Sequence, residues 1–479
     1  MKKSILFVGL ILSLMSCQDV LQEDPKSIVE ERFYNTAGEV ETAVNAIFPP
    51  LRAYNAFGAL FPWQLESYSD FIHGRGSYAI LSEMQGLNST NITRIGSMWD
   101  QFYLAIRNAN LVIKNAPNAT NINEEAINQY LAEARFMRAF IYFNMIQKFG
   151  KLVLRTESNM EELHIPLSTS EEVYNQILED LVFAEQHLSG TPSSTGRPTV
   201  WAAKSVLAHV YLVRGDYAGT MEKANEVINS GNFALVEVNT AEDFQNLYGP
   251  DIDNTEEEIF YIKYNRESGW PFVEFLHHPE DPYYNGAGLF AHYIDTTEYS
   301  VWNKWDEQDL RKQLFYPWDF GLGPHTMLNN KFMDTERTGA AGNDYPFYRY
   351  ADILLMYAEA AARVNNGPTH DAIEKLNMVH RRAYGKSSTQ PSEIDFELSE
   401  YPDLESFLDL VIMERGYETY LEGGKRWLDL IRLGRERTRE IIKEGTGKDV
   451  ADRHFLWPIP ETEIELNDAI DQSDQNPGY

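Results

Sequence analysis

The residues whose types and spacing come nearest to a catalytic set lie towards the carboxyl end of the chain. They are Glu414, Arg415, Glu418, Glu422 and Arg426. Glycoside hydrolysis needs two carboxyl groups that face each other across a sugar bond, and no such pair stands out among the 72 acidic residues. The set recurs mostly at i,i+4 spacing, which is typical of ion pairs along one helix. The pattern therefore predicts a structural role and no catalytic residue.

Other signatures of catalysis or metal binding are missing from the sequence. There is no HExxH, no GxSxG and no phosphate-binding loop. His277 and His278 stand together beside Pro279, without the spacing of a metal site. The acidic run at 251–258 offers oxygen ligands of the kind that calcium prefers, but it lacks the spacing of a known calcium loop. We expect this run to be a solvated face, and we predict no cofactor and no metal ion.

Two irregular regions carry the groups that bind carbohydrate. Flat aromatic rings stack on the C–H faces of sugars, and amides, carboxylates and guanidinium groups bind the hydroxyls. The candidates in the first region are Trp63, Tyr68, Asp70 and Arg75. Those in the second are Trp270, Tyr283, Tyr284, Trp302, Trp305 and Trp318. For any one of these rings, packing in the core is as good an expectation as contact with a ligand.

The first residues read as an export signal. Lys2 and Lys3 precede an apolar run at 5–15 that is too short to span a bilayer, and Ser16 then leads to Cys17. We predict a signal peptide at 1–16, lipidation of Cys17 and a polar tether at 17–32; the alternative is an ordinary secretory signal with an incidental cysteine. Because Cys17 is the only cysteine, disulfides and thiol catalysis are excluded from the mature protein.

The net charge of −31 disfavours nucleic acid as a partner, because like charges repel. Helical periodicity is strong up to about residue 240, for example at 128–149 and 171–188. The stretch 201–231 has the small and aromatic residues of a tetratricopeptide-like helical hairpin, and a poorer copy runs over 353–383. Between about 240 and 348 the periodicity fades, which predicts a loop-rich region over a helical scaffold.

The order of these signals resembles the SusD/RagB family over nearly the whole chain. The early matches include FYNT at 33–36, the stretch 130–143 and GRPT at 196–199. The later matches are RYADILLMYAEA at 349–360, ERGYETYLEGGKRWLDLIR at 414–432, WPIP at 457–460 and QNPGY at 475–479. The resemblance implies a mostly helical, all-α SusD-like fold with tetratricopeptide-like hairpins. It divides the mature chain into a helical region at 33–240, a loop-rich ligand or partner region at 241–348 and a signature region at 349–479.

The resemblance also implies a role. Family members are lipid-anchored at the outer-membrane surface, facing the exterior, where they capture oligosaccharides and deliver them to a SusC-like TonB-dependent transporter without catalysis. Any single loop aromatic is then as well explained by transporter contact as by ligand contact. Two alternatives stay open: capture of a peptide or glycopeptide for the same kind of transporter, and, more remotely, a surface glycoside hydrolase.

Overall fold

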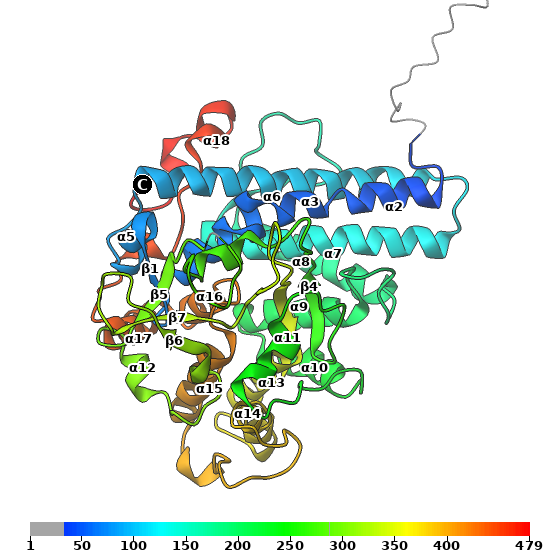
Figure 1. The fold of residues 1–479 in the computed structure, drawn as a ribbon. Coiled ribbons are helices and arrows are strands. Elements are labelled where there is room, and N and C mark those ends of the chain that lie inside the picture. The colour runs from blue at the N-terminus through cyan, green and yellow to red at the C-terminus, as the bar shows by residue number, and fades with distance from the viewer. Residues whose placement is uncertain (1–32, 287) are drawn as a thin grey trace, which may run out of the picture.

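The computed structural model describes residues 33–286 and 288–479, and these residues are mostly helical, as predicted. Two long helices, α6 (Ser89–Asn115) and α7 (Glu124–Phe149), run antiparallel along one side of the molecule, with α2 (Ala37–Asn45) and α3 (Phe48–Arg52) beside them (Figure 1). Most of the remaining helices and the labelled strands lie below this layer in the view, whereas α18 (Glu461–Leu466) lies above it. The predicted signal peptide, Cys17 and the tether lie outside the described residues.

The helix ends follow the local sequence. Helix α7 begins after Asn123, whose side chain accepts from the backbone of Ala126, and it ends at Gly150, which takes a positive φ of 70°. Helix α8 (Ser170–His187) begins with a capping box between Thr169 and Glu172. From about residue 132 onwards α7 is buried on nearly all sides. The buried surface is wider than one apolar stripe, because α6 and α8 both pack on this helix.

Two helical hairpins fall where the tetratricopeptide-like pattern places them. The first pairs α9 (Val200–Arg214) with α10 (Tyr217–Ile228), and the second pairs α13 (Tyr350–Val364) with α14 (His370–Ala383). Gly215 adopts a left-handed conformation between α9 and α10, and Asp216 then caps α10 by accepting from the backbone of Gly219. The other helices that concern the site are α4 (Leu60–Glu66), α5 (Ala79–Ser82), α12 (Ser300–Lys304), α15 (Leu404–Thr419), α16 (Lys425–Arg432), α17 (Arg435–Thr446) and α18 (Glu461–Leu466).

The region at 241–348 contributes most of the strands, each too short to show a clear alternating pattern. A four-stranded antiparallel sheet has the order β1 (His73–Gly74), β5 (His292–Asp295), β7 (Thr326–Asn329), β6 (Phe315–Pro317). Strand β4 (Glu258–Ile262) pairs with β8 (Tyr345–Arg349), and β2 (Leu152–Val153) pairs with β3 (Leu167–Ser168). His73 in the first irregular region lies opposite Tyr293 in the second, so the sheet joins the two regions.

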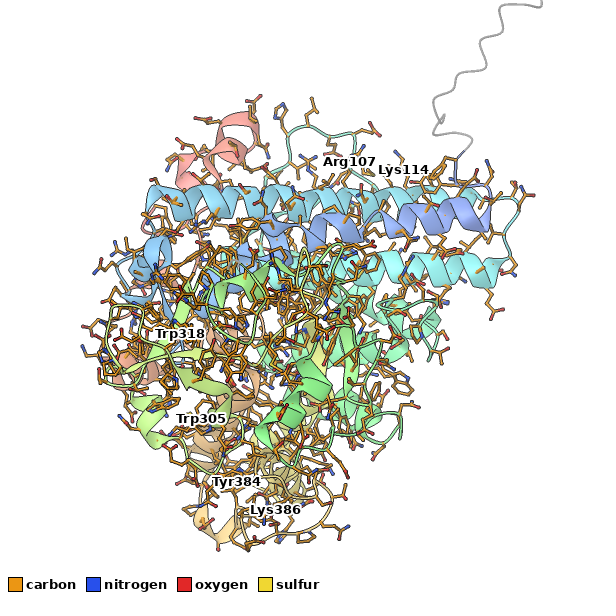
Figure 2. All side chains as sticks on the ribbon, in the orientation of Figure 1. Arg107, Lys114, Trp305, Trp318, Tyr384 and Lys386 are labelled. Carbon is orange, nitrogen blue, oxygen red and sulfur yellow. The ribbon has the colours of Figure 1, made fainter. Side chains whose placement is uncertain are left out.

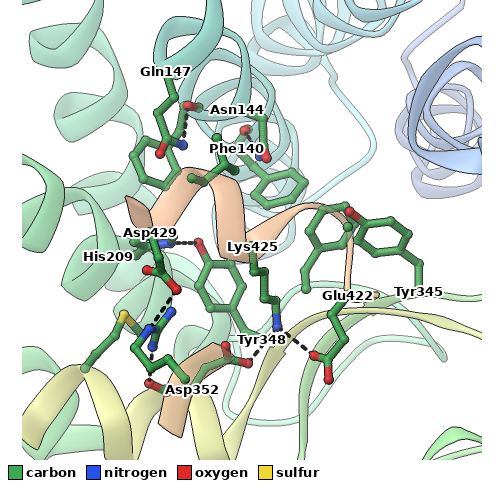
Figure 3. Close-up of a pocket in the computed structure, with 16 residues that line it drawn as sticks. Phe140, Asn144, Gln147, His209, Tyr345, Tyr348, Asp352, Glu422, Lys425 and Asp429 are labelled. Atoms are coloured by element: carbon green, nitrogen blue, oxygen red, sulfur yellow. Dashed lines mark hydrogen bonds and ion pairs between the residues drawn. The ribbon is translucent and has the colours of Figure 1, made fainter. Parts of the chain in front are cut away.

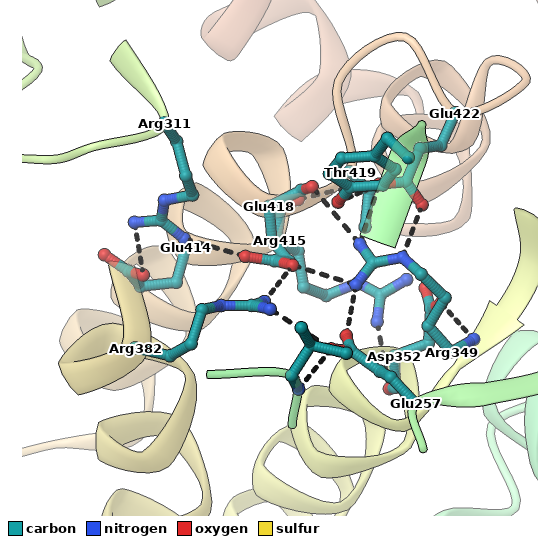
Figure 4. Close-up of polar contacts among 12 residues, drawn as sticks. Glu257, Arg311, Arg349, Asp352, Arg382, Glu414, Arg415, Glu418, Thr419 and Glu422 are labelled. Atoms are coloured by element: carbon teal, nitrogen blue, oxygen red, sulfur yellow. Dashed lines mark hydrogen bonds and ion pairs between the residues drawn. The ribbon is translucent and has the colours of Figure 1, made fainter. Parts of the chain in front are cut away.

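A buried ion network holds the carboxyl-terminal third together (Figure 4). Arg349 contacts Glu418 at 2.9 Å and Glu422 at 2.7 Å, while Arg311 contacts Glu414 at 3.1 Å. These buried pairs agree with the structural role predicted for the charged residues at 414–426. The predicted i,i+4 pairing along one helix is wrong. Helix α15 ends at Thr419, before Glu422, and the partners come from other elements of the fold.

The acidic run at 251–258 is only partly a solvated face. Glu257 is fully buried and pairs with Arg349 and Arg382, and Glu258 pairs with Lys263 at 2.7 Å. The prediction of a solvated run is therefore wrong for these two residues. The sequence could not show that Arg349 at the end of β8 and Arg382 on α14 reach Glu257, or that Lys263 pairs with Glu258. Among the described residues, no helix combines the length and apolar character that crossing a membrane would need.

Candidate functional site

Six of the ten candidate ligand residues are buried in the core. They are Trp63, Tyr68, Asp70, Trp270, Tyr284 and Trp305. Trp63 packs against Phe275 and Tyr78, and the Trp305 indole N–H donates to Asp309 at 2.8 Å while its ring stacks on Tyr417. A ring enclosed in this way has no free face for a sugar. The structure thus places these six among core and ion-pair residues and leaves Arg75, Tyr283, Trp302 and Trp318 partly exposed.

Trp318, which is labelled in Figure 2, follows strand β6 of the four-stranded sheet and belongs to a partly exposed aromatic surface. We call this surface the platform. It consists of Tyr283, Tyr316, Trp318, His278, Phe290, Phe320 and Arg75. The Trp318 ring centroid lies 5.1 Å from that of His278, and the rings of Phe290 and Phe320 are 5.4 Å apart. Leu289, next to Phe290 in the chain, and Leu322, in the turn after Phe320, are 47% and 48% exposed.

The β6–β7 hairpin presents Trp318 and Phe320. Trp318 and Thr326 close the hairpin, since the Trp318 N–H donates to the Thr326 carbonyl at 3.1 Å and the Thr326 hydroxyl donates back at 2.8 Å. Within the turn, Asp319 accepts from the backbone N–H groups of Gly321 at 2.8 Å and Gly323 at 3.1 Å. Both glycines have positive φ, which a side chain at these positions would strain. The turn therefore has a defined shape.

Asp281 organises the other half of the platform from below. Its carboxylate accepts from the Tyr316 hydroxyl at 2.8 Å, from the Tyr283 backbone at 2.9 Å and from His277 at 3.1 Å. Burial works to raise the pKa of Asp281, but the hydrogen bonds and charge of its partners, His277 first, outweigh burial and hold that pKa below its ordinary value. His277 is itself fixed by a 2.6 Å contact with the Phe332 carbonyl.

Arg75 is the polar group of the platform. Its guanidinium carbon lies 3.7 Å from the centroid of the Phe290 ring and 5.6 Å from that of Phe320. One guanidinium nitrogen also donates to the Phe290 carbonyl at 3.4 Å. Because β1 pairs with β5, the first irregular region thus contributes a charged donor to an aromatic surface built by the second. Rings beside a guanidinium suit a ligand with both apolar faces and hydroxyl groups.

Trp302 is partly exposed but belongs to a different cluster. Its ring packs edge-on against Phe315, with centroids 5.6 Å apart, and the ammonium of Lys312 lies 4.6 Å from its centroid. It therefore serves as a comparison residue for Trp318.

An enclosed cavity lies between α7, α9, α13 and α16 (Figure 3). Lys425 there contacts Asp352 at 2.8 Å and Glu422 at 3.0 Å, and His209 contacts the Tyr348 hydroxyl at 2.9 Å. Burial lowers the pKa of His209 to about 3. The cavity has a volume of about 40 Å³, which suits water molecules and is too small for a sugar.

A wider groove of about 680 Å³ lies between the loop at 190–199 and β4. Trp201, Phe233, Asn232 and Asn254 contribute to its lining. Trp201 lies at the start of the predicted helical hairpin at 201–231, on helix α9. Its indole N–H donates to the Gly190 carbonyl at 3.2 Å, which fixes the ring in place. This groove is the physical alternative to the platform.

Four platform residues were not among the ligand-binding residues predicted from the sequence: His278, Phe290, Tyr316 and Phe320. Tyr316, Trp318 and Phe320 alternate with Pro317 and Asp319, a period of two at the end of a short strand. That alternation was the available signal. His278 and Phe290 carry no comparable signal, because only the tertiary fold brings them to Trp318.

Two family models match this chain. Residues 319–479 match the model described as SusD family, and residues 26–212 match the model described as starch-binding associating with outer membrane. A curated relative, SusD-like protein P2 of Formosa agariphila, is 28% identical, and the alignment covers 100% of both chains. SusD-like protein P25 of the same organism is 22% identical over 99% of each chain.

Solved structures share the fold. A SusD homolog from Bacteroides thetaiotaomicron superposes with a TM-score of 0.77 at 21% identity, covering 94% of this chain and 98% of the other. Surface glycan-binding protein A from Bacteroides fluxus superposes with a TM-score of 0.72 at 22% identity, covering 93% of this chain and 100% of the other.

Proposed function

Because this chain belongs to the SusD/RagB family, we propose that it is a non-catalytic surface lipoprotein that captures oligosaccharides on the platform. It delivers them to a cognate SusC-like TonB-dependent transporter. The observation that carries the proposal is the juxtaposition of Trp318, Phe290 and Phe320 with the guanidinium of Arg75. Sugar rings stack on such faces, and the guanidinium supplies hydrogen-bond donors for hydroxyls.

The shape of the platform favours glycan over peptide as the ligand. Its rings lie together on a partly exposed surface, whereas the enclosed cavity beside Lys425 has room only for water. An open aromatic surface binds one face of an extended oligosaccharide, while peptide capture calls for a deep polar cavity. The relative named as a surface glycan-binding protein supports the same choice.

Two carboxylates at the platform, those of Asp281 and Asp319, are engaged in holding its shape. Asp281 accepts from three side chains or backbone groups described above, and Asp319 accepts from two glycine N–H groups. A glycosidase needs one carboxyl group free to donate a proton and a second aligned across the sugar bond. These two carboxylates instead accept hydrogen bonds that shape the binding surface, which supports binding without hydrolysis.

The proposed location is the exterior face of the outer membrane, through lipid on Cys17. The family model described as associating with outer membrane supports the membrane, and the sequence order around Ser16 and Cys17 supports the anchor. A lipid anchor on a tether would leave the platform mobile above a transporter.

A binding panel tests the proposed function. The protein at 18–479 is screened against plant, microbial and host glycans and against peptides, with Trp318→Ala as the site variant and Trp201→Ala as the matched control. We expect a glycan that binds the native protein and Trp201→Ala alike, and whose affinity falls about tenfold or more in Trp318→Ala. Binding of a peptide together with no binding of any glycan would overturn the glycan proposal. Loss of glycan binding in Trp201→Ala alone would place the binding site in the groove.

A further inference from the structure

His73 has a buried imidazole ring. One of its ring nitrogens makes a hydrogen bond, and the other makes none to the described residues. It lies on β1 opposite Tyr293, and only 8% of its surface is exposed. Its Nδ1 lies 3.2 Å from the Tyr299 hydroxyl, which fixes the ring. Among the described residues, no hydrogen bond reaches Nε2. The nearest charged group is Oε1 of Glu83 at 4.0 Å, too far for a hydrogen bond.

Two carboxylates lie beside the His73 ring. Glu83 follows helix α5, and its two oxygens are used differently: Oε2 contacts the Lys448 ammonium at 2.7 Å, while Oε1 faces His73. Glu298 stands in the turn after β5, whose backbone is held by Asp295. One ligand atom from each of His73, Glu83 and Glu298 lies within 4.8 Å of the other two.

We propose that His73, Glu83 and Glu298 form a binding site for a divalent first-row transition cation, with zinc as its best occupant. An imidazole nitrogen with carboxylate oxygens suits zinc, whereas calcium and magnesium prefer oxygen ligands alone. Ligand atoms around a tetrahedral zinc ion stand about 3.4 Å apart, given bonds of about 2.0–2.1 Å. The 4.0 Å gap between His73 and Glu83 needs only a small contraction, and the exposed side chain of Glu298 is free to turn inwards.

The surroundings match those of a metal ligand. Histidines that bind metal usually have their second nitrogen hydrogen-bonded, as Tyr299 does here for His73. The Lys448 ammonium orients Glu83 while leaving Oε1 available. Tyr293 lies 5.1 Å from His73 and 5.3 Å from Phe320, measured between ring centroids, so a bound ion would brace one end of the platform. The site does not depend on which ligand the platform binds.

Calorimetric titration with zinc chloride tests the site. The probe is zinc alone, the protein is untagged 18–479 freed of metal with a chelator, and the variants are Glu298→Gln and Glu83→Gln. Glu280→Gln is the control, because Glu280 is an exposed acid of the same region outside the cluster. We expect one saturable zinc site in the native protein and in the control, with affinity at least about tenfold weaker in Glu298→Gln. Zinc should also raise the unfolding temperature of the native protein.

Either of two results would overturn the site. One is the absence of saturable zinc binding in the native protein. The other is zinc affinity that is the same in the native protein, Glu298→Gln and Glu83→Gln, since adventitious surface binding would not respond to these positions. Glycan binding is measured in parallel on the same variants. Because the platform residues are unchanged in all of them, the zinc site and the glycan-binding platform are tested separately.

Discussion

Arg426 and Asp70 form a buried bidentate ion pair, with both N–O distances at 2.7 Å, although 356 positions separate them in the chain. Asp70 follows α4 in the first irregular region, and Arg426 lies on α16 in the signature region. The pair therefore ties the amino-terminal and carboxyl-terminal parts of the fold together. It also explains why Asp70, a candidate ligand residue by sequence, is unavailable to a ligand.

Asp70→Ala should destabilise the protein without changing the platform. Removing one partner leaves the Arg426 guanidinium buried and uncompensated, at a cost of about 3–5 kcal/mol in the free energy of unfolding. Urea unfolding measures the change. The control is Asp409→Ala, which removes one of the two carboxylate partners of the more exposed Arg437, the other being Glu440, and should cost about 1 kcal/mol or less. Equal losses in the two variants would show that the buried pair has no special role.

Asp281→Asn should weaken glycan binding while the fold is kept. The amide replaces one of the two carboxylate oxygens by an NH2 group, either Oδ2, which accepts from the Tyr316 hydroxyl, or Oδ1, which accepts from the Tyr283 backbone. The platform therefore loses part of its support from below. We expect a rise of about tenfold in the dissociation constant, and a smaller rise for Tyr316→Phe, which removes a single hydrogen bond. Calorimetric titration with the recognised glycan checks this. Native affinity in Asp281→Asn would mean that the platform holds its shape without this carboxylate.

Acid should unfold the protein through the buried network. Burial works to raise the pKa of Glu414, but Arg311 and His380 outweigh burial and lower it to about 2, against 4.5 for an ordinary glutamate. Between these two values the unfolded chain binds more protons than the folded protein. The contribution of Glu414 to stability is therefore complete above about pH 4.5, and it is lost as the pH falls towards 2.

Urea midpoints at about pH 6 and about pH 3 measure this loss for the native protein and for Glu414→Gln. We expect Glu414→Gln to be less stable than the native protein at about pH 6. Its stability should also fall by less than that of the native protein between about pH 6 and about pH 3. Glu405→Gln is the control, because Glu405 is an exposed acid on the same helix. A native-like pH dependence in Glu414→Gln would contradict the assignment.

Gly424→Ala should destabilise the protein by more than its left-handed backbone conformation alone would cost. Gly424 has a φ of 82°, and a Cβ atom there would overlap the Cβ of Leu65 on α4. Gly447 has a φ of 73°, with open space around the missing side chain. Gly447→Ala should therefore cost about 1 kcal/mol for the left-handed backbone alone, whereas Gly424→Ala adds the clash. Thermal unfolding compares the stabilities of the two variants. Equal losses of stability would mean that α4 moves to accommodate the added Cβ at no cost in free energy.

The helices could be predicted from sequence because their signals are local. Thr169 with Glu172 marks the start of α8, and Gly150 marks the end of α7. The strands escaped prediction because they have two to five residues, too few to show a period of two. The ion network was recognised as structural, but its partners depend on contacts such as Arg349 with Glu257, which helical spacing cannot show.

The candidate site could be predicted by residue type and region but not by individual residue. Trp270, Trp305 and Trp318 occur in the same irregular segment with similar neighbours, yet the first two are buried and only Trp318 joins the platform. Burial of a tryptophan depends on which distant segments cover it. For Trp305 that segment includes Tyr417, more than a hundred residues away.

The central claim is that the rings of Trp318 and Phe320 bind sugar. Its most direct test is calorimetric titration of the recognised oligosaccharide into the native protein, into the double variant Trp318→Ala with Phe320→Ala, and into Trp302→Ala. We predict loss of measurable binding in the double variant, and native affinity in Trp302→Ala, whose ring packs against Phe315 and Lys312 instead. Native affinity in a folded double variant would contradict the account and place the glycan elsewhere on the molecule.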